Sequence, residues 1–349
     1  MRATTQRMAL LETLGKVKSA VPGKHVLPVC KSVLIRAAGG QVTLTGTDLE
    51  VGVTGSCKAS ITRQGAVCVP PRDLEILLRA VKTEIVSLSL VGTNSLKVEA
   101  GAAITIEGQE SQDFPVVPGV KGQAVEVTGL ADAFKQISYA AAKDDCRPIL
   151  AGVCFTPDKG RIALAAADGF RLAETTVKAK GQLEQTVIPG KAIKLVEKLM
   201  PGKVSLHKGE HHISFVGEGL VLTARLIEGT YPNYKRVIPK NGKPLTVDSA
   251  ALKDALKVVM ATKPSRNIVR FRTKGANLIV SAKADEKSEI TVPVPATGKA
   301  KIAFDGNYIK DVLARTSGPV TLRTKNAQSP GVVKQNGTIH VIMPMHVEW

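Results

Sequence analysis

The sequence is poor in aromatic residues, in paired cysteines and in long apolar runs. Aromatic residues make up 3% of the 349 residues, with one tryptophan and four tyrosines. The odd set of five cysteines (Cys30, Cys57, Cys68, Cys146 and Cys154) contains no C-x-x-C pair, which excludes a disulfide framework and a zinc ribbon, and we interpret them as small core residues. No apolar run approaches the roughly 18 residues of a membrane span, and the N-terminus lacks a signal-peptide h-region. We therefore expect a cytoplasmic protein without membrane contact.

Motifs for several kinds of catalysis are also missing. No G-x-x-x-x-G-K-[ST] string is present, which argues against P-loop nucleotide hydrolysis. His207, His211 and His212 have no cysteine nearby, and the last two would point to opposite faces of a strand. The acidic pairs 144–145 and 285–286 are isolated beside basic residues, whereas a nuclease needs clustered carboxylates. We expect no catalytic residue, metal or cofactor, with a nucleic-acid enzyme as the alternative class.

Positive charge is the most pronounced feature that is present. Forty-eight lysines and arginines against 30 acidic residues give a formal net charge of +18. A field of this sign concentrates phosphates and gains from counterion release, so the composition predicts a polyanionic partner, with nucleic acid favoured. A general bias toward lysine is the alternative, and the location of the charge must decide.

The chain repeats one pattern three times. Amphipathic helices are predicted over 8–21, 130–142 and 250–262, and second helices over 71–81, 190–200 and 307–316. Stretches with β-branched or alternating residues lie between and after them. The repeat predicts an α+β protein of three domains, 1–121, 122–241 and 242–349, each with two helices packed on antiparallel sheets.

One face of each predicted helix is apolar and the other is rich in lysine and arginine. A set of basic faces on one concave side would suit a duplex backbone irrespective of base sequence. Acidic residues also stand among these cations, so an ordinary solvated helix surface is the alternative. The candidate DNA contacts on or next to these helices are Arg72, Arg79, Lys135, Lys143, Lys191, Lys194, Lys198, Lys253 and Lys257.

The stretch IEGTYPNYKRVIPKN, residues 227–241, contains two of the four tyrosines. Tyr231-Pro232 occupies the place in the second repeat that Phe114-Pro115 occupies in the first. Proline favours extended backbone before it, and the aromatic residue can anchor the departing chain on the domain just completed. This accounts for Tyr231 and Pro232 and leaves Tyr234 and Arg236 without a role.

Five strings in order, LTGTDLE (44–50), QDFP (112–115), AADGFRLA (166–173), GTYPNYKRVIPKN (229–241) and VIMPM (341–345), resemble the bacterial sliding clamp, the β subunit of DNA polymerase III. The resemblance covers essentially the whole chain. It implies a three-domain crescent that pairs head to tail with a second copy into a ring around double-stranded DNA. Such a clamp has no active site, is opened by an ATP-driven loader, and tethers DNA polymerases and clamp-loader subunits through short linear motifs. Lys24 stands where the family has a basic DNA-contacting residue.

The resemblance also implies a peptide-binding groove between the second and third domains. Without the family resemblance, we would interpret the string VIMPM as an edge strand and Arg171 as a surface arginine. Methionines would supply an adaptable floor for several partner peptides. The groove positions are Arg147, Leu150, Ala167, Phe170, Arg171, Leu172, Pro232, Arg236, Val237, Val341, Met343, Pro344 and Met345, with Asp305 and Tyr308 at the rim.

The ring-closing surfaces implied by the resemblance are Ile104 and Ile106 in the first domain and Met260 and Arg266 in the third. Arg266 falls where the family often has a phenylalanine, and burying an unpaired arginine costs several kcal/mol. Glu107 or Glu110 of a partner copy could pair with it. Without such a pair, the alternative is a monomeric or weakly dimeric clamp-like basic DNA-binding protein. Trp349 could lie across the groove or dock elsewhere.

Overall fold

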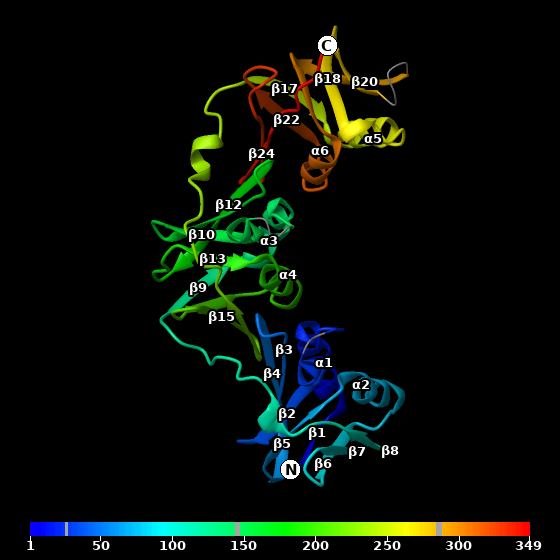
Figure 1. Ribbon diagram of the computed structural model, residues 1–349, viewed down its shortest axis with the longest axis vertical. Helices are drawn as coiled ribbons and strands as arrows, with labels where there is room; N and C mark the ends of the chain where they lie inside the picture. The colour runs from blue at the N-terminus through cyan, green and yellow to red at the C-terminus, as the bar shows by residue number, and fades with distance from the viewer. Residues whose placement is uncertain (25–26, 144–146, 284–287) are drawn as a thin grey trace. The chain divides into compact units, whose positions relative to one another are not determined.

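The computed structural model describes residues 1–24, 27–143, 147–283 and 288–349 (Figure 1). The chain forms two compact units. Unit 1 consists of Met1–Ala131, Lys178–Leu183 and Lys191–Leu226, and unit 2 consists of Asp132–Val177, Glu184–Gly190 and Ile227–Trp349. Among the described residues, no helix has both the length and the apolar character needed to cross a membrane.

The order of helices and strands repeats three times. The first repeat contains β1 (Arg2–Gln6), α1 (Arg7–Val17), β2 (Val33–Ala38), β3 (Gln41–Thr47), β4 (Val51–Arg63), β5 (Gly65–Val69), α2 (Pro71–Ala80), β6 (Ile85–Val91), β7 (Ser95–Glu99) and β8 (Ala103–Glu107). The second contains β9 (Ala124–Thr128), α3 (Leu130–Ile137), β10 (Gly152–Asp158), β11 (Arg161–Ala167), β12 (Arg171–Lys180), β13 (Thr186–Pro189), α4 (Gly190–Leu199), β14 (Val204–Lys208), β15 (His212–Gly217) and β16 (Leu220–Arg225). The third contains β17 (Lys243–Asp248), α5 (Ser249–Met260), β18 (Ile268–Lys274), β19 (Asn277–Lys283), β20 (Glu289–Gly298), β21 (Lys301–Asp305), α6 (Gly306–Leu313), β22 (Pro319–Thr324), β23 (Gly331–Gln335) and β24 (Thr338–Ile342).

Strand pairing repeats with the element order and is antiparallel. In each repeat the first strand pairs with the fourth and the sixth. The second strand pairs with the third and the fifth. The last three strands form a meander. The predicted α+β fold with a threefold repeat is confirmed.

Consecutive repeats are joined by strand pairing at two seams. In the first seam, within unit 1, β4 pairs with β16, and Val51 lies opposite Ala224. In the second seam, within unit 2, β12 pairs with β24, and Arg171 lies opposite Ile342. The two seams therefore use equivalent strands of successive repeats.

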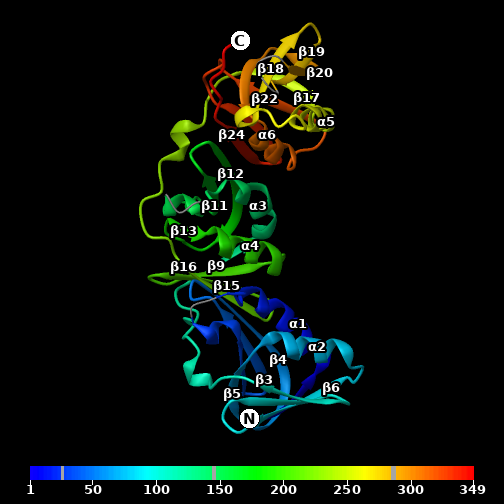
Figure 2. The same cartoon turned by 45° about the vertical axis from the view of Figure 1, so that its right-hand side comes forward.

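The helices pack through the apolar faces that the sequence predicted. In the third repeat, residues of α5 and α6 form one buried cluster with Phe271 and Phe304 of the neighbouring strands. Figure 2 shows both helices beside the strands of this repeat. Both helices are capped at their N-termini. The side chain of Asp248 accepts hydrogen bonds from the amides of Ala250 and Ala251, both at 3.0 Å, and that of Asp305 accepts one from the amide of Asn307 at 2.8 Å. Hydrophobic periodicity and capping thus agree at these helices.

The cysteines and the two chain exits also follow the sequence predictions. Cys30, Cys57, Cys68 and Cys154 are buried thiols, whereas Cys146 and the acidic pairs 144–145 and 285–286 lie outside the described residues. Phe114 is buried against the first repeat and Tyr231 against the second, which confirms their anchoring role.

One sequence prediction and one alternative interpretation are wrong. Helix α3 ends at Ile137 and is followed by a short 3-10 turn, Ser138–Ala140, so Lys143 lies beyond the helix rather than on its face. Arg171 is not a surface arginine, because only 7% of the residue is exposed. Local sequence could not reveal this burial, since the groups that cover Arg171 come from distant parts of the chain.

Candidate peptide-binding groove and nucleic-acid face

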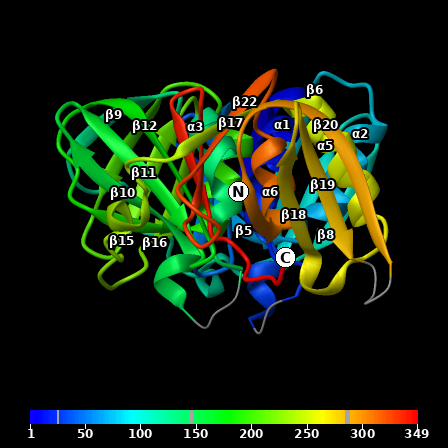
Figure 3. The ribbon, with the colours of Figure 1, turned by 90° about the horizontal axis from the view of Figure 1, so that it is seen from above.

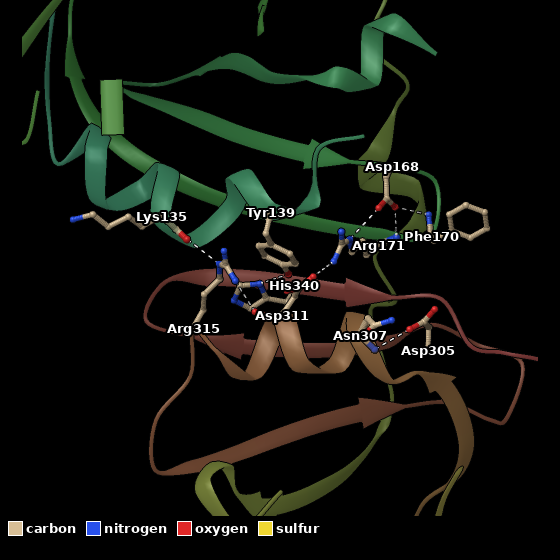
Figure 4. Close-up of polar contacts among 10 residues, drawn as sticks. All are labelled: Lys135, Tyr139, Asp168, Phe170, Arg171, Asp305, Asn307, Asp311, Arg315 and His340. Carbon is tan, nitrogen blue, oxygen red and sulfur yellow. Dashed lines mark hydrogen bonds and ion pairs between the residues drawn. The ribbon is translucent and has the colours of Figure 1, made fainter. Parts of the chain in front are cut away.

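Arg171 is the centre of a polar cluster in the second seam (Figure 4). Its Nε donates a hydrogen bond to Asp168 Oδ2 at 2.9 Å, and its Nη1 donates to Asp311 Oδ2. The guanidinium also lies over two aromatic rings, 4.6 Å from the centroid of Tyr308 and 5.2 Å from that of Tyr139. Burial opposes the charge of Arg171, but the two carboxylates outweigh burial and raise its pKa.

The turn before β12 presents Asp168 to this arginine. Asp168 Oδ1 accepts hydrogen bonds from the amides of Phe170 and Arg171, both at 2.9 Å, which leaves Oδ2 for the guanidinium. The carbonyl of Asp168 accepts a further bond from Arg147 Nη2 at 2.8 Å. Asp168 and Gly169 thus form a turn, and Asp168 additionally orients Arg171.

Arg315 closes the other side of the cluster. Its guanidinium carbon lies 4.2 Å from the ring centroid of Tyr139, and its Nε donates to the carbonyl of Lys135 at 2.8 Å. The Tyr139 hydroxyl is 2.9 Å from His340 Nδ1. Burial raises the pKa of Tyr139, and burial together with Arg315 lowers the pKa of His340 to about 4, so this histidine is neutral near pH 7.

An aromatic pair, the exposed Phe170 and the half-buried Tyr308, lies beside Arg171. Phe170 is 56% exposed, and its ring stacks on Tyr308 with the centroids 6.3 Å apart. The carbonyl of Phe170 accepts a hydrogen bond from the amide of Met343 at 2.8 Å, and the amide of Met345 donates to the carbonyl of Ala303 at 2.8 Å. The segment after β24 is thereby held beside the aromatic pair.

An apolar cluster supports this surface from below. Tyr231 and Tyr234 are buried with Leu172 and Val341, and the Tyr234 hydroxyl donates to Glu174 Oε1 at 2.9 Å. Tyr234, which had no role in the sequence prediction, therefore anchors the turn that carries Arg236 and Val237.

All the predicted groove residues lie in unit 2, at different depths. The buried ones are Leu150, Arg171, Leu172 and Val341; the half-buried ones are Ala167, Asp305, Tyr308, Pro344 and Met345; the exposed ones are Arg147, Phe170, Pro232, Arg236, Val237 and Met343. Val237 at 48% and Met343 at 38% join Phe170 as exposed apolar side chains. Burial raises the pKa of the rim carboxyl of Asp305. The arrangement offers a partner exposed apolar side chains on a rigid polar base.

The predicted DNA-contacting cations fall into two groups. Four bond to other residues: Arg79 to Glu75 at 2.8 Å, Lys135 to Asp132 at 2.9 Å, Lys191 to Asp48, and Lys253 Nζ to the carbonyl of Thr316 at 3.0 Å. The others are exposed and form no ion pair with a described residue; they are Lys24, Arg72, Lys143, Lys194, Lys198 and Lys257. No described acidic residue neutralises the charge of the second group.

The four predicted ring-closing residues differ in accessibility. Ile106 is buried within its own repeat, whereas Ile104 is half-buried. Met260 packs against the core of the third repeat. Arg266 is exposed, with a left-handed backbone at φ 52°. Ile104, Met260 and Arg266 therefore present more surface to a partner than the buried Ile106 does.

Sequence reasoning missed Tyr139, Asp311, Arg315 and His340 as members of the site. Their distance along the chain hides their proximity, but one signal was available. All four tyrosines of this aromatic-poor chain (Tyr139, Tyr231, Tyr234 and Tyr308) lie in unit 2 around the second seam. Such a concentration of a rare residue type marks a specialised surface.

A threefold repeat of helices on antiparallel sheets, with cationic helices and one aromatic surface at a seam, defines the class of DNA sliding clamps. The N-terminal domain of the DNA polymerase III beta subunit matches residues 1–118, and the central domain of that subunit matches residues 124–233. A beta sliding clamp of Pseudomonas putida is 30% identical over 99% of this chain and all of its own length.

Solved structures lead to the same class. The DNA polymerase III subunit beta of Pseudomonas aeruginosa is 27% identical, covers 99% of this chain and 100% of its own, and superposes with a TM-score of 0.92. A sliding clamp of the same species bound to griselimycin is 26% identical over the same shares, with a TM-score of 0.90. The chain belongs to the DNA polymerase III beta subunit family, and its function is that of a DNA sliding clamp, a processivity factor in DNA replication.

Proposed function

We propose that two copies of the chain close into a ring around duplex DNA, each contributing three domains bounded at 1–121, 122–241 and 242–349. The threefold element order and the family matches to the first two repeats support these boundaries. Such a ring stays on the duplex because it encloses the DNA, not because it binds the DNA tightly. This function needs no catalytic residue. Because it works on bacterial DNA, its place of action is the cytoplasm.

Free strand edges support head-to-tail closure. At the two seams, the fourth strand of one repeat pairs with the last strand of the next. Two strands have no such partner among the described strands. They are β20, the fourth strand of the third repeat, and β8, the last strand of the first repeat. Pairing of β20 with β8 of a second copy would repeat the seam and cover both edges, which would otherwise invite uncontrolled association. Arg266 would lie near this junction, where Glu107 of the partner could neutralise it.

Exposed helix cations would hold the DNA without reading its sequence. Lys194 and Lys198 project from α4, Arg72 from α2 and Lys257 from α5, and none forms an ion pair with a described residue. Phosphate contacts of this kind fix position but carry no base information. A ring centred by such contacts can slide.

The second seam would be the docking site for DNA polymerases and clamp-loader subunits, which bind through short linear motifs. The observation that carries this assignment is the Phe170–Tyr308 pair on the buried Arg171, with Met343 bonded alongside. A peptide segment could bury its apolar side chains against Phe170, Val237 and Met343 without the surface having to reorganise.

Ring formation is tested by sedimentation and by DNA topology. We expect a dimer near twice 36.9 kDa in dilute solution. Clamp loaded on a circular duplex should remain bound until the circle is cut, and should then slide off. A protein that stays monomeric and leaves circular and linear DNA at equal rates would favour the monomeric clamp-like alternative.

The groove is tested with one matched pair of variants. Met343→Glu should abolish binding of a peptide with the clamp motif, measured by fluorescence anisotropy, because it places a charge in the apolar surface. Val116→Glu, at a highly exposed valine in unit 1, is the control and should bind normally. Equal peptide affinity in both variants would refute the assignment.

The helix face is tested by charge reversal. Lys194→Glu with Lys198→Glu should weaken duplex binding and flatten its salt dependence. The control reverses two exposed strand lysines of unit 1, Lys58 and Lys178. If the control changes the salt slope as much as the helix variant does, the binding is not directed to the helices.

A further inference from the structure

A second cationic surface lies on the strands of the third repeat, away from its helices. Val269 and Phe271 of β18 point into the core that contains α5 and α6. Side chains alternate along a strand, so Arg270, Arg272 and Lys274 project from the opposite face of the sheet. Lys283 of β19 and Lys301 of β21 lie on the same face, by the same alternation. We call the five cations Arg270, Arg272, Lys274, Lys283 and Lys301 the outer cationic face.

Most of the charges of this face have no acidic partner among the described residues. Arg272 lies directly opposite Lys301 in the pairing of β18 with β21, and like charges in opposed positions destabilise a sheet. None of the five cations forms an ion pair with a described residue. The four strands β18–β21 contain two acidic residues: Glu289 lies opposite Lys283, and Asp305 caps α6, which leaves Arg270, Arg272, Lys274 and Lys301 without an opposed carboxylate. A bound polyanion would relieve the repulsion that the fold leaves in place.

The C-terminal segment brings the chain's single tryptophan to this face. Met345 bonds to Ala303 of β21, and the ring of Trp349 lies over the same strand, with its centroid 5.2 Å from Lys301 Nζ. Figure 3 shows the C-terminus beside β18, as do the other two ribbon views. Trp349 remains 45% exposed. An aromatic ring is therefore available next to a row of cations.

We propose that the outer cationic face binds single-stranded DNA, with phosphates along Arg270, Arg272 and Lys274 and a base stacked on Trp349. Alternate residues of a strand are about 6.8 Å apart, a separation comparable to that of successive phosphates in an extended single strand. A single strand can turn an unpaired base onto the indole, whereas the bases of a duplex are stacked inside it. The helix face proposed for the duplex lies on other elements, so this function is additional to encirclement.

An acidic protein segment is the other partner with matching charge. Charge alone would suit both partners, but the exposed indole favours the nucleic acid, because every base offers a face for stacking. The two partners also predict different spectroscopic behaviour. Stacking of a base changes the fluorescence of Trp349, whereas an acidic side chain pairing with Lys301 leaves the indole without a stacked ring.

The chain's single tryptophan makes the test direct. A short oligothymidylate titrated onto the full-length protein should quench the fluorescence of Trp349, and an abasic oligomer of equal length should bind without comparable quenching. Trp349→Ala should weaken binding of a labelled oligothymidylate by roughly 5- to 150-fold, measured by anisotropy. Arg270→Ser with Arg272→Ser should lower the salt slope of binding by about 1.4, the value for two phosphate contacts in single strands.

The matched control removes two exposed cations from the helices of the same repeat. Lys257→Ser with Lys310→Ser should leave oligothymidylate binding unchanged, while Arg270→Ser with Arg272→Ser should leave retention on circular duplex unchanged. These strand substitutions also remove opposed like charges, so the melting temperature should not fall. The proposal is overturned if the helix and strand variants lose equal affinity, or if polyglutamate binds and quenches as strongly as oligothymidylate does.

Discussion

The two seams are built by equivalent strands but differ in the chemistry at equivalent positions. The first seam places Val51 opposite Ala224, and the second places Arg171 opposite Ile342. Leu222 in the first seam occupies the place of His340 in the second, by the same pairing. One strand register therefore accommodates either an apolar junction or a buried charged one.

Small residues fill the first seam. A Cβ on Gly52 would lie 2.5 Å from Val117 Cγ1, so the chain leaving the first repeat packs directly on this strand. Asp48 forms the same turn as Asp168, accepting the amides of Glu50 and Val51 at 3.1 and 2.8 Å. Its second oxygen pairs with Lys191 from α4 rather than with an arginine in the strand.

The difference shows where the chain accepts the cost of buried charge. A buried ion pair rarely adds stability over an apolar contact, because desolvation offsets the attraction. The second seam nevertheless contains Arg171 between two carboxylates and two rings, and one of these rings, Tyr308, stacks on the exposed Phe170. Rigidity of a binding surface is a reason to maintain such a cluster at one seam and not at the other.

Removing the central charge should have the largest effect. Arg171→Ala leaves Asp168 and Asp311 without their partner, and should destabilise unit 2 by about 3–5 kcal/mol. Val51→Ala at the equivalent position should cost unit 1 only roughly 1–3 kcal/mol. Urea denaturation measures the stability loss of each variant, and hydrogen exchange of amides in β12 and β4 assigns the loss to unit 2 or to unit 1. Equal losses would mean that the charged cluster contributes no more than ordinary packing.

Lowering the pH should have the second-largest effect, and it should destabilise the second seam more than the first. His340 has a pKa of about 4 in the folded protein and about 6.5 when unfolded, so the unfolded state binds more protons between these values. Stability of unit 2 should therefore fall by up to about 1.4 kcal/mol per pH unit as the pH drops from 6.5 to 4. His340→Asn, which can still accept the hydrogen bond of Tyr139, should flatten this dependence. Leu222 does not titrate, so melting of the first seam should lack this contribution; an unchanged profile in His340→Asn would contradict the account.

Exchanging side-chain size should reveal how the first seam is packed. Gly52→Leu, which copies Leu172 of the second repeat, should cost roughly 1–3 kcal/mol by displacing Val117. The double variant with Val117→Gly should recover part of that loss, and a double-mutant cycle on urea midpoints measures the coupling. Additive losses would show that the two side chains do not compete for one space.

The smallest expected effect concerns the ion pair between the half-exposed Lys191 and the buried Asp48 in the first seam. Lys191 is about half exposed, so Lys191→Met should cost unit 1 only about 0.2–1 kcal/mol, and less in high salt. The cost is small because Asp48 keeps its two amide hydrogen bonds. A loss comparable to that of Arg171→Ala would remove the distinction between the two seams.

Sequence reasoning predicted the repeated parts of the fold better than the site. Leu10, Leu130 and Leu252 occupy equivalent positions in the first helix of each repeat. Each of these helices lies near its predicted range. The groove residues were identified by resemblance, but the support beneath them was not. Tyr139, Asp311 and Arg315 looked like ordinary helix-surface residues, because the sequence does not show which repeat covers which face. Lys143 was misplaced for a local reason, since α3 ends before its hydrophobic pattern does.

The sequence by itself determined the period, the helix faces, the chain exits and the excess of positive charge, because these depend on neighbours a few residues apart. Only the tertiary structure decided which positions become buried at the seams. Strand pairing between repeats brings Arg171 beside Asp311, and the C-terminal segment, bonded to β21 within the third repeat, brings Trp349 beside Lys301. Burial and charge pairing depend on groups that are distant in the chain, and these determine whether an arginine acts as a surface cation or as the base of a binding site.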